Sequence, residues 1–314
     1  MTAGWETELC GIHLAHPILN ASGTFDAIAA QRVFGPELLE RFPFSAFVSK
    51  TITPSPRFGN PPPRIYETAS GMINSIGLPN KGLAGFLAED LPRLAELPVP
   101  LIVSVMASER NGFATLVEAL DKRSSVAAIE LNISCPNVES GLIVGENPGE
   151  TEALLERLRP LTPKPLIVKL TPNVADPSAI ALGAERGGAD AVSLINTLKA
   201  SARNPAGFEP WLGGGRGGLS GHAIRAVAVE QVRAVVAAVS IETVGMGGIE
   251  TGADALDFIA AGARAIAVGT ASFRDPLAAA RILGELDTEL TALESGAASE
   301  IRPPRTAGPA DDRP

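Results

Sequence analysis

Residues 128–171 contain a complete strand–helix–strand unit, formed by AIELNIS (Ala128–Ser134), ETEALLERLR (Glu150–Arg159) and LIVKLT (Leu166–Thr171). The two outer segments are mostly apolar, which is typical of strands buried on both faces, whereas the middle segment repeats leucine at helical spacing. A strand, a crossover helix and a second strand predict two parallel strands in one sheet.

The same alternation continues along the chain in both directions. Six further strands are predicted at Pro17–Ser22, Ala46–Thr51, Leu101–Ala107, Ala191–Thr197, Glu242–Gly247 and Ala265–Thr270. Helices are predicted at Ala29–Arg41, Leu83–Glu96, Phe113–Arg123, Glu150–Arg159, Pro177–Arg186, His222–Ala238, Gly252–Ala261 and Pro276–Leu290. Eight strands that are each followed by a helix predict an α/β fold, a single (β/α)8 TIM barrel.

We expect residues 1–290 to form one catalytic domain and residues 291–314, which lack apolar periodicity, to form a disordered C-terminal tail. Two connections are unusually long, Ile52–Lys81 after strand two and Leu198–Ser220 after strand six. Both leave the carboxyl ends of their strands, where barrel enzymes keep their active sites, so we predict loops that cover a site. Gly213–Gly218 match the spacing G-x-G-x-x-G, but no predicted strand ends before them, so we interpret them as loop.

Charge and composition exclude several classes of protein. The 314 residues carry a formal net charge of -9 and contain no run of Lys or Arg, which argues against nucleic acid as a partner. No apolar stretch approaches the roughly 20 residues needed to span a bilayer, and the N-terminus lacks the pattern of a secretory signal. We therefore expect a cytoplasmic protein without a membrane partner.

Metal and hydrolase chemistry have little support. Two cysteines are too few for an iron–sulfur cluster, which usually takes four thiolates. His13, His16 and His222 do not lie at metal-ligand spacing from carboxylates, so we predict no metal site. The chain also lacks a G-x-S-x-G elbow.

Polar residues gather instead at the carboxyl ends of six predicted strands. They are Asn20, Ser22, Lys50, Thr51, Ser104, Asn132, Ser134, Cys135, Lys169, Thr171, Asn196 and Thr197. Because these ends surround one mouth in a closed barrel, we expect a single site there. Cys135 follows strand four at this mouth, a position that favours a catalytic thiol over an inert one, whereas Cys10 is expected to be inert, buried or in a hairpin near the N-terminus.

The last two predicted strands end in glycine-containing turns, Gly245–Gly248 and Gly269–Thr270, and each leads into a helix. Such turns are either tight connections or a phosphate site, since glycine lets the backbone approach an anion and helix-start amides point toward it. A phosphorylated substrate or cofactor would explain the pair, and flavin mononucleotide (FMN) fits the apolar mouth.

Several motifs, in this order, resemble the catalytic subunit of class 1 dihydroorotate dehydrogenases, and class 1B more than class 1A. The matching segments are Asn20–Phe25, Ser49–Thr51, Arg57–Pro61, Asn74–Asn80, Asn132–Asn137, Ile195–Thr197, Gly217–Gly221 and the two glycine turns. The resemblance implies oxidation of dihydroorotate to orotate in de novo pyrimidine biosynthesis, with FMN at the barrel mouth. It also implies that Cys135 is the base that removes the C5 proton while hydride passes from C6 to flavin N5.

The resemblance assigns the remaining site residues. Substrate binding is implied for Lys50, Asn74, Ser75, Ile76, Gly77, Leu78, Asn132, Asn137, Asn196 and Thr197. FMN binding is implied for Ala21, Ser22, Lys50, Thr51, Ser104, Asn132, Lys169, Ile195, Gly221, Gly247, Gly248, Gly269 and Thr270. Lys169 would lie near flavin N1 and O2, where a positive charge stabilises the reduced ring.

Class 1B also implies a partner subunit that carries FAD and an iron–sulfur cluster and passes electrons to NAD, with a homodimer of this chain inside a heterotetramer. The two cysteines agree with that division of cofactors. The alternatives are a fumarate-linked class 1A enzyme, a related flavin barrel that oxidises other dihydropyrimidines, and a catalytically silent flavin-binding subunit.

Overall fold

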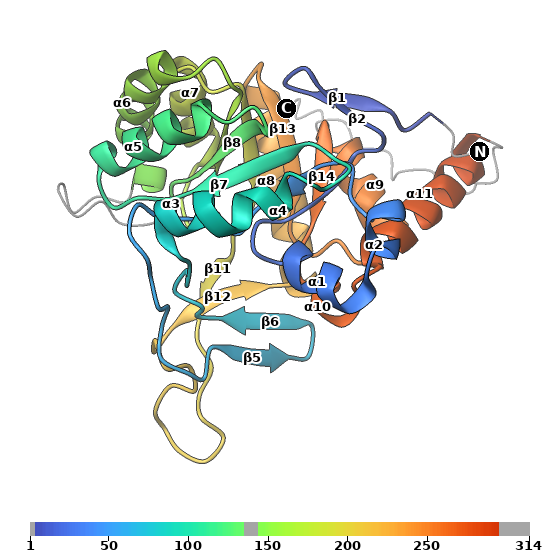
Figure 1. The fold of residues 1–314 in the computed structure, drawn as a ribbon. Coiled ribbons are helices and arrows are strands. Elements are labelled where there is room, and N and C mark those ends of the chain that lie inside the picture. Colours follow the sequence, from blue (N-terminus) through green and yellow to red (C-terminus); the bar gives the residue numbers. More distant parts are fainter. Residues whose placement is uncertain (1–3, 135–143, 295–314) are drawn as a thin grey trace, which may run out of the picture.

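The computed structural model describes residues 4–134 and 144–294, which form a parallel sheet with helices around it (Figure 1). The eight strands of the sheet hydrogen-bond in the order β3-β14-β13-β10-β9-β8-β7-β4. They are β3 (Ile18–Asn20), β4 (Phe47–Val48), β7 (Leu101–Val105), β8 (Val126–Asn132), β9 (Leu166–Lys169), β10 (Ala191–Leu194), β13 (Glu242–Met246) and β14 (Ala265–Val268). All eight predicted strands, and the TIM barrel, are confirmed.

Hydrogen bonds between β3 and β4 close the barrel. The Ser45 amide donates to the Ile18 carbonyl at 3.0 Å. Farther along, the side chain of Asn20 takes the place of a backbone strand: its Nδ2 donates to the Val48 carbonyl and its Oδ1 accepts from the Val48 amide, each at 2.8 Å. Asn20 is fully buried and does not line the cavity described below, so this predicted mouth residue joins two strands instead.

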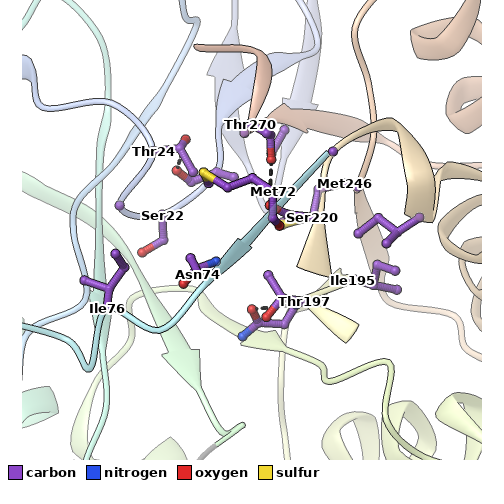
Figure 2. A pocket seen from close by; sticks show the side chains of 18 of the residues that line it. Ser22, Thr24, Met72, Asn74, Ile76, Ile195, Thr197, Ser220, Met246 and Thr270 are labelled. Carbon is purple, nitrogen blue, oxygen red and sulfur yellow. Dashed lines mark hydrogen bonds between the residues drawn. The ribbon is translucent and has the colours of Figure 1, made fainter. Parts of the chain in front are cut away.

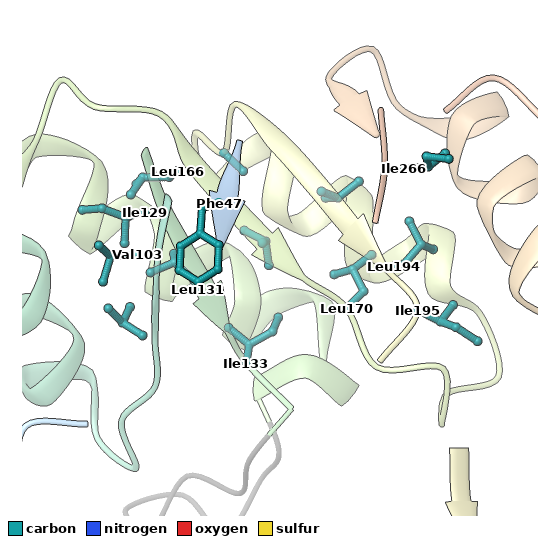
Figure 3. Close-up of a cluster of buried hydrophobic side chains, with 14 of the residues drawn as sticks. Phe47, Val103, Ile129, Leu131, Ile133, Leu166, Leu170, Leu194, Ile195 and Ile266 are labelled. Atoms are coloured by element: carbon teal, nitrogen blue, oxygen red, sulfur yellow. The ribbon is translucent and has the colours of Figure 1, made fainter. Parts of the chain in front are cut away.

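Alternate side chains of each strand face opposite sides of the barrel wall. The interior is filled by small and medium apolar side chains, among them Leu19, Ala128 and Ile167. The outward-facing side chains pack against the surrounding helices in a larger cluster (Figure 3). This double burial explains why the strands are apolar throughout rather than alternating.

Two hairpin strands, β1 (Thr7–Leu9) and β2 (Ile12–Leu14), precede the barrel. Leu9 and Leu14 are fully buried in the interior cluster, where they plug its amino-terminal end. Cys10 and Gly11 form the turn, with φ of 51° and 75°, as two-residue hairpin turns of type I′ require. The predicted hairpin position of Cys10 is confirmed.

The helices that surround the barrel follow the predicted order. They are α1 (Ala27–Phe34), α2 (Glu37–Glu40), α3 (Gly82–Gly85), α4 (Leu91–Leu94), α5 (Arg110–Asp121), α6 (Pro148–Leu158), α7 (Pro177–Arg186), α8 (Arg225–Ala238), α9 (Gly252–Ala260), α10 (Ala271–Arg274) and α11 (Ala278–Glu294). None of the helices in the described part of the chain is long and apolar enough to cross a membrane.

Three predicted helices differ in detail. The segment 29–41 is two helices because Gly35 and Pro36 end α1. The segment 83–96 contains a π-helical stretch, Phe86–Asp90, between α3 and α4. The helix predicted to end at Leu290 continues to Glu294, so the first residues of the predicted tail are helical, and residues 295–314 lie outside the described part.

The two long connections pair with each other, which the sequence did not predict. They contribute β5 (Ile65–Thr68), β6 (Gly71–Asn74), β11 (Leu198–Ala200) and β12 (Gly217–Ser220) to an antiparallel sheet of order β11-β12-β6-β5, here called the outer sheet. Leu219 pairs with Ile73 and with Leu198, so segments far apart in sequence lie side by side below the barrel in Figure 1. Interpreting Gly213–Gly218 as loop was therefore wrong for its last two glycines.

Candidate active site

A cavity of about 340 Å³ lies between the carboxyl ends of the barrel strands and the outer sheet (Figure 2). It is lined by these predicted site residues: Ala21, Ser22, Lys50, Thr51, Asn74, Ile76, Leu78, Asn132, Lys169, Ile195, Asn196, Thr197, Gly221, Gly247, Gly248, Gly269 and Thr270. These residues come from most of the chain, and the fold brings them to one place, as the barrel geometry predicts.

Three predicted site residues do not line the cavity. The hydroxyl of Ser104 is buried behind Thr51, with 2.9 Å between the two oxygens. The Ser75 hydroxyl accepts from Asn60 Nδ2 at 2.9 Å. Gly77 packs against Asn60 as well, since a Cβ there would lie 2.5 Å from the Asn60 amide nitrogen. The structure therefore gives these three residues supporting contacts.

Two further predicted residues, Cys135 and Asn137, lie outside the described part of the chain. The last described residue before them, Ser134, accepts a hydrogen bond from Asn196 Nδ2 at 3.0 Å. The chain thus leaves β8 beside a cavity residue.

One end of the cavity presents backbone amides. The N–H groups of Gly248, Gly269 and Thr270 donate no backbone hydrogen bond within the described residues. The positive φ of 80° at Gly248 turns the backbone there, and a side chain at this position would meet Arg225 and the Gly221 carbonyl. Unpaired amides beside a cavity are suited to a phosphate or another oxyanion.

The wall near Ser22 is held by a row of hydroxyl groups. Ser22 Oγ donates to the Ser49 carbonyl at 2.9 Å and lies 3.2 Å from Thr51 Oγ1. The Ser104 amide donates to Ser49 Oγ at 3.1 Å. These bonds join the chain after β3, β4 and β7, so the positions of Ser22 and Thr51 are fixed by their neighbours.

Two lysines bring positive charge to the cavity. Lys169, at the end of β9, is only 6% exposed, yet it makes no hydrogen bond or ion pair with another side chain in the described part of the chain. Lys50 follows β4, and partial burial lowers the pKa of its ammonium group, an effect that Asp26 opposes and Arg64 reinforces. A buried cation without a partner is costly, so Lys169 favours an anionic or electron-rich ligand, and the more exposed Lys50 adds a second positive charge to the same cavity.

Three asparagines provide amide groups around the same space. Asn132 Oδ1 accepts from the Ser134 amide at 3.3 Å, and Asn196 Oδ1 accepts from the Thr197 amide at 2.8 Å. Asn74 Nδ2 makes only a long contact of 3.4 Å to the Gly218 carbonyl. Each side chain keeps donor or acceptor capacity for a ligand that has both C=O and N–H groups.

Cys10 lies far from this cavity, at the opposite end of the barrel. Its amide donates to Glu242 Oε2 at 2.5 Å, and burial, followed by the charge of Glu242, raises the pKa of its thiol to about 12. A thiol with so high a pKa is neither a base nor a nucleophile near neutral pH.

Several lining residues were not predicted as site residues. They are Gly23, Thr24, Ile65, Met72, Ser220, Ile224, Met246, Ala267 and Phe273. Gly23 and Thr24 belong to a segment that carried the family resemblance, which was the available signal. Ile65 and Met72 reach the cavity through the outer sheet, which local sequence does not predict. In the described part of the chain, no group of His, Cys, Asp or Glu is placed to hold a metal ion.

These features define a (β/α)8 barrel with a cavity at its carboxyl face, where unpaired backbone amides suit an oxyanion and asparagine side chains suit a ligand with amide groups. The profile of the dihydroorotate dehydrogenase family matches residues 5–290. The chain belongs to the dihydroorotate dehydrogenase family, a family of flavin-dependent oxidoreductases.

Relatives of this family cover most of the chain. The dihydroorotate dehydrogenase B (NAD(+)) catalytic subunit of Desulforudis audaxviator is 47% identical over 287 residues, which are 90% of this chain and 91% of that protein. The subunits of the same name from Halalkalibacterium halodurans and Listeria monocytogenes are 42% and 39% identical, over 91% and 95% of this chain and 93% and 97% of theirs. The predicted similarity to class 1B is confirmed.

A solved structure shows the same fold. The crystal structure of the dihydroorotate dehydrogenase of Eimeria tenella in complex with ferulenol superposes with a TM-score of 0.76 at 23% identity, covering 93% of this chain and 86% of that one. At this identity the likeness supports the barrel and nothing finer.

Proposed function

We propose that this chain is a catalytic subunit that oxidises dihydroorotate to orotate in pyrimidine biosynthesis, with FMN bound in the cavity. One observation carries the proposal: the same cavity is lined by residues with unpaired backbone amides and by three asparagines and Lys50. The first set is suited to the phosphate of a nucleotide cofactor, and the second to a pyrimidinedione that bears a carboxylate.

The cavity fits FMN in its donor groups. Gly248, Gly269 and Thr270 would bind the phosphate through their amides, and Ile195 and Met246 supply apolar surface to the isoalloxazine ring. The buried ammonium group of Lys169 would stabilise negative charge on the flavin. FMN, when bound, supplies the acceptor for the hydride of the substrate.

The substrate would be held by side chains on the strand ends. Lys50 is the cationic group available to the carboxylate of dihydroorotate, and the amides of Asn74, Asn132 and Asn196 match the alternating C=O and N–H groups of its ring. We assign the removal of the C5 proton to Cys135, which lies outside the described residues. The residue before it in sequence, Ser134, accepts a hydrogen bond from Asn196. A thiol has an ordinary pKa near 8.5, so a modest downward shift makes it a base at neutral pH.

We further propose that a separate subunit with FAD and an iron–sulfur cluster passes the electrons to NAD. The relatives, which are named as NAD(+)-linked catalytic subunits, support this route. The two cysteines of this chain cannot ligate a cluster, which usually takes four thiolates. A homodimer of this chain within a heterotetramer and a cytoplasmic location belong to the same proposal.

Anaerobic mixing of the purified yellow protein with dihydroorotate tests the oxidation directly. We expect bleaching of the flavin absorbance and formation of orotate, while dihydrouracil, which lacks the carboxylate, leaves the flavin oxidised. Bleaching by dihydrouracil at a similar rate would assign the chain to another dihydropyrimidine oxidation. A yellow protein that neither compound bleaches would be a silent flavin-binding subunit.

Co-purification from native cells tests the electron route. We expect a second flavoprotein with an iron–sulfur spectrum to purify with the chain, and the complex to reduce NAD. Reduction of fumarate by the isolated chain, with no partner, would contradict the NAD-linked assignment.

A further inference from the structure

Asn173 lies just outside the cavity and joins the ends of three strands. Its Nδ2 donates to the Thr197 carbonyl at 3.0 Å, after β10, and to Thr171 Oγ1 at 2.9 Å, after β9. Its Oδ1 accepts from the Lys199 amide at 2.8 Å, in β11 of the outer sheet. The side chain therefore uses both its donor and its acceptor to connect the barrel with the outer sheet.

The contact with Thr197 fixes two cavity residues together. The Thr197 carbonyl is held by Asn173 and the Thr197 amide by Asn196 Oδ1. On the other side Gly218 of β12 packs closely, since a Cβ there would lie 1.9 Å from Thr197 Oγ1. Asn196 and Thr197 thus have little freedom to move as long as Asn173 holds the Thr197 carbonyl and the Lys199 amide.

The contact with Lys199 extends toward the segment that carries Cys135. Lys199 Nζ lies 3.0 Å from Glu146 Oε1, in the short turn Val144–Glu146 that follows residues 135–143. This ion pair is exposed and contributes little stability by itself. The hydrogen bonds from Asn173 to Thr197 and Thr171 are partly buried, so they are better shielded from water than this ion pair.

An ordinary loop-capping role does not explain these bonds. The loop after β9 leads to α7, and the N-terminus of α7 is capped by Asp176, whose Oδ1 accepts from the Ser178 and Ala179 amides. The Asn173 side chain points instead to the residues after β10, whose side chains line the cavity.

We propose that Asn173 is a positioning residue for dihydroorotate oxidation, which holds Asn196 and Thr197 in place for the substrate by tying the segment that joins β10 to β11 to the loop after β9. This inference rests on the proposed function. An amide is needed because a carboxylate could still accept from the Lys199 amide but would face the Thr197 carbonyl without a proton to donate.

Two variants and one matched control test the proposal on the FMN-loaded protein. Asn173→Asp removes only the donor, and Asn173→Ala removes both groups. The control is Asn204→Asp. Asn204 also shapes a loop, since its Nδ2 donates to Glu209 Oε1 and its Oδ1 accepts from the Ala206 amide, but it does not line the cavity. The readouts are the Kd of orotate, from its perturbation of the flavin spectrum, and the KM and kcat for dihydroorotate.

We expect Asn173→Asp to raise the orotate Kd and the dihydroorotate KM about tenfold, because the hydrogen bond to the Thr197 carbonyl is lost while the Thr171 hydroxyl can still donate to the new carboxylate. We expect kcat to change less than threefold and the FMN content to stay unchanged. The control should stay within twofold of the wild type. An orotate Kd for Asn173→Asp within twofold of the wild type would overturn the proposal, even if the variant melts at a lower temperature.

Hydrogen exchange separates failure of this inference from failure of the proposed function. The Lys199 amide should remain protected in Asn173→Asp and lose protection in Asn173→Ala, whether or not a pyrimidine binds. Equal protection in the wild type and Asn173→Ala would contradict the tie to β11. A wild-type protein that binds no orotate would instead refute the proposed function.

Discussion

Replacing Asn20 by alanine tests how the barrel is closed. In the wild type its side chain satisfies both the amide and the carbonyl of Val48, and Val48 is only 5% exposed. A buried backbone group left without a partner costs about 1–3 kcal/mol, so the two groups together give an expected loss of about 2–6 kcal/mol in the free energy of unfolding. That loss is a large fraction of the roughly 5–15 kcal/mol of a typical native protein.

Urea denaturation followed by circular dichroism, at equal FMN concentration, measures this loss. Asn204→Ala is the matched control, because its contacts lie in a water-accessible loop and their loss should cost less than about 1 kcal/mol. We also expect weaker FMN binding by Asn20→Ala, since Ser22 and Thr51 follow the two strands that Asn20 joins. A stability loss of Asn20→Ala no larger than that of the control, with an unchanged m value, would refute this account of the closure.

Three other perturbations address the site and the fold. Cys135→Ala should keep FMN and orotate binding but slow flavin reduction by about 10²–10⁴-fold, and Cys135→Ser should recover rate only at higher pH; reduction of Cys135→Ala at the normal rate would remove the base assignment. Lys169→Ala should lower the two-electron flavin potential by about 40–90 mV. This figure takes the interaction between the Lys169 charge and the reduced flavin as about 2–4 kcal/mol, for a distance of a few ångströms and an effective dielectric near 20. Lys199→Ala, which changes an exposed lysine, should leave the potential unchanged. Burial lowers the pKa of His16 from 6.5 to about 4, so below pH 6.5 the unfolded state binds more protons than the folded state and stability falls between pH 6.5 and 4. His16→Gln should remove that part of the pH dependence. If urea denaturation at pH 4.5 and pH 7 gave the same difference in the free energy of unfolding for His16→Gln as for the wild type, the result would contradict it.

The barrel strands could be predicted because burial on both faces leaves a plain signal. LIVKLT at Leu166–Thr171 is apolar up to the residues that reach the mouth, and β9 ends at Lys169, where the side chains become functional. The outer sheet could not be predicted in the same way. Gly217–Ser220 has no strand-like composition and becomes β12 by pairing with β11 and with β6, which lies more than a hundred residues earlier.

The polar residues at the strand ends predicted where the site lies, but not which of them line the cavity and which bind neighbouring strands. Asn20 and Ser104 come at strand ends like Asn132 and Lys169, yet both are fully buried and bind neighbouring strands. Glu130 lies in the barrel strand β8, where an apolar residue is expected. It is 3% exposed, and its Oε2 lies 3.1 Å from Ser193 Oγ. Such distinctions depend on strand register and on the partner across the barrel, which local sequence does not encode.

A crystal structure of the protein with FMN and orotate tests the central claim most directly. The account predicts the phosphate on the amides of Gly248, Gly269 and Thr270, the ammonium group of Lys169 at the flavin, and orotate between the flavin and the asparagines at 74, 132 and 196. A flavin phosphate bound elsewhere, or orotate out of reach of these asparagines, would contradict it.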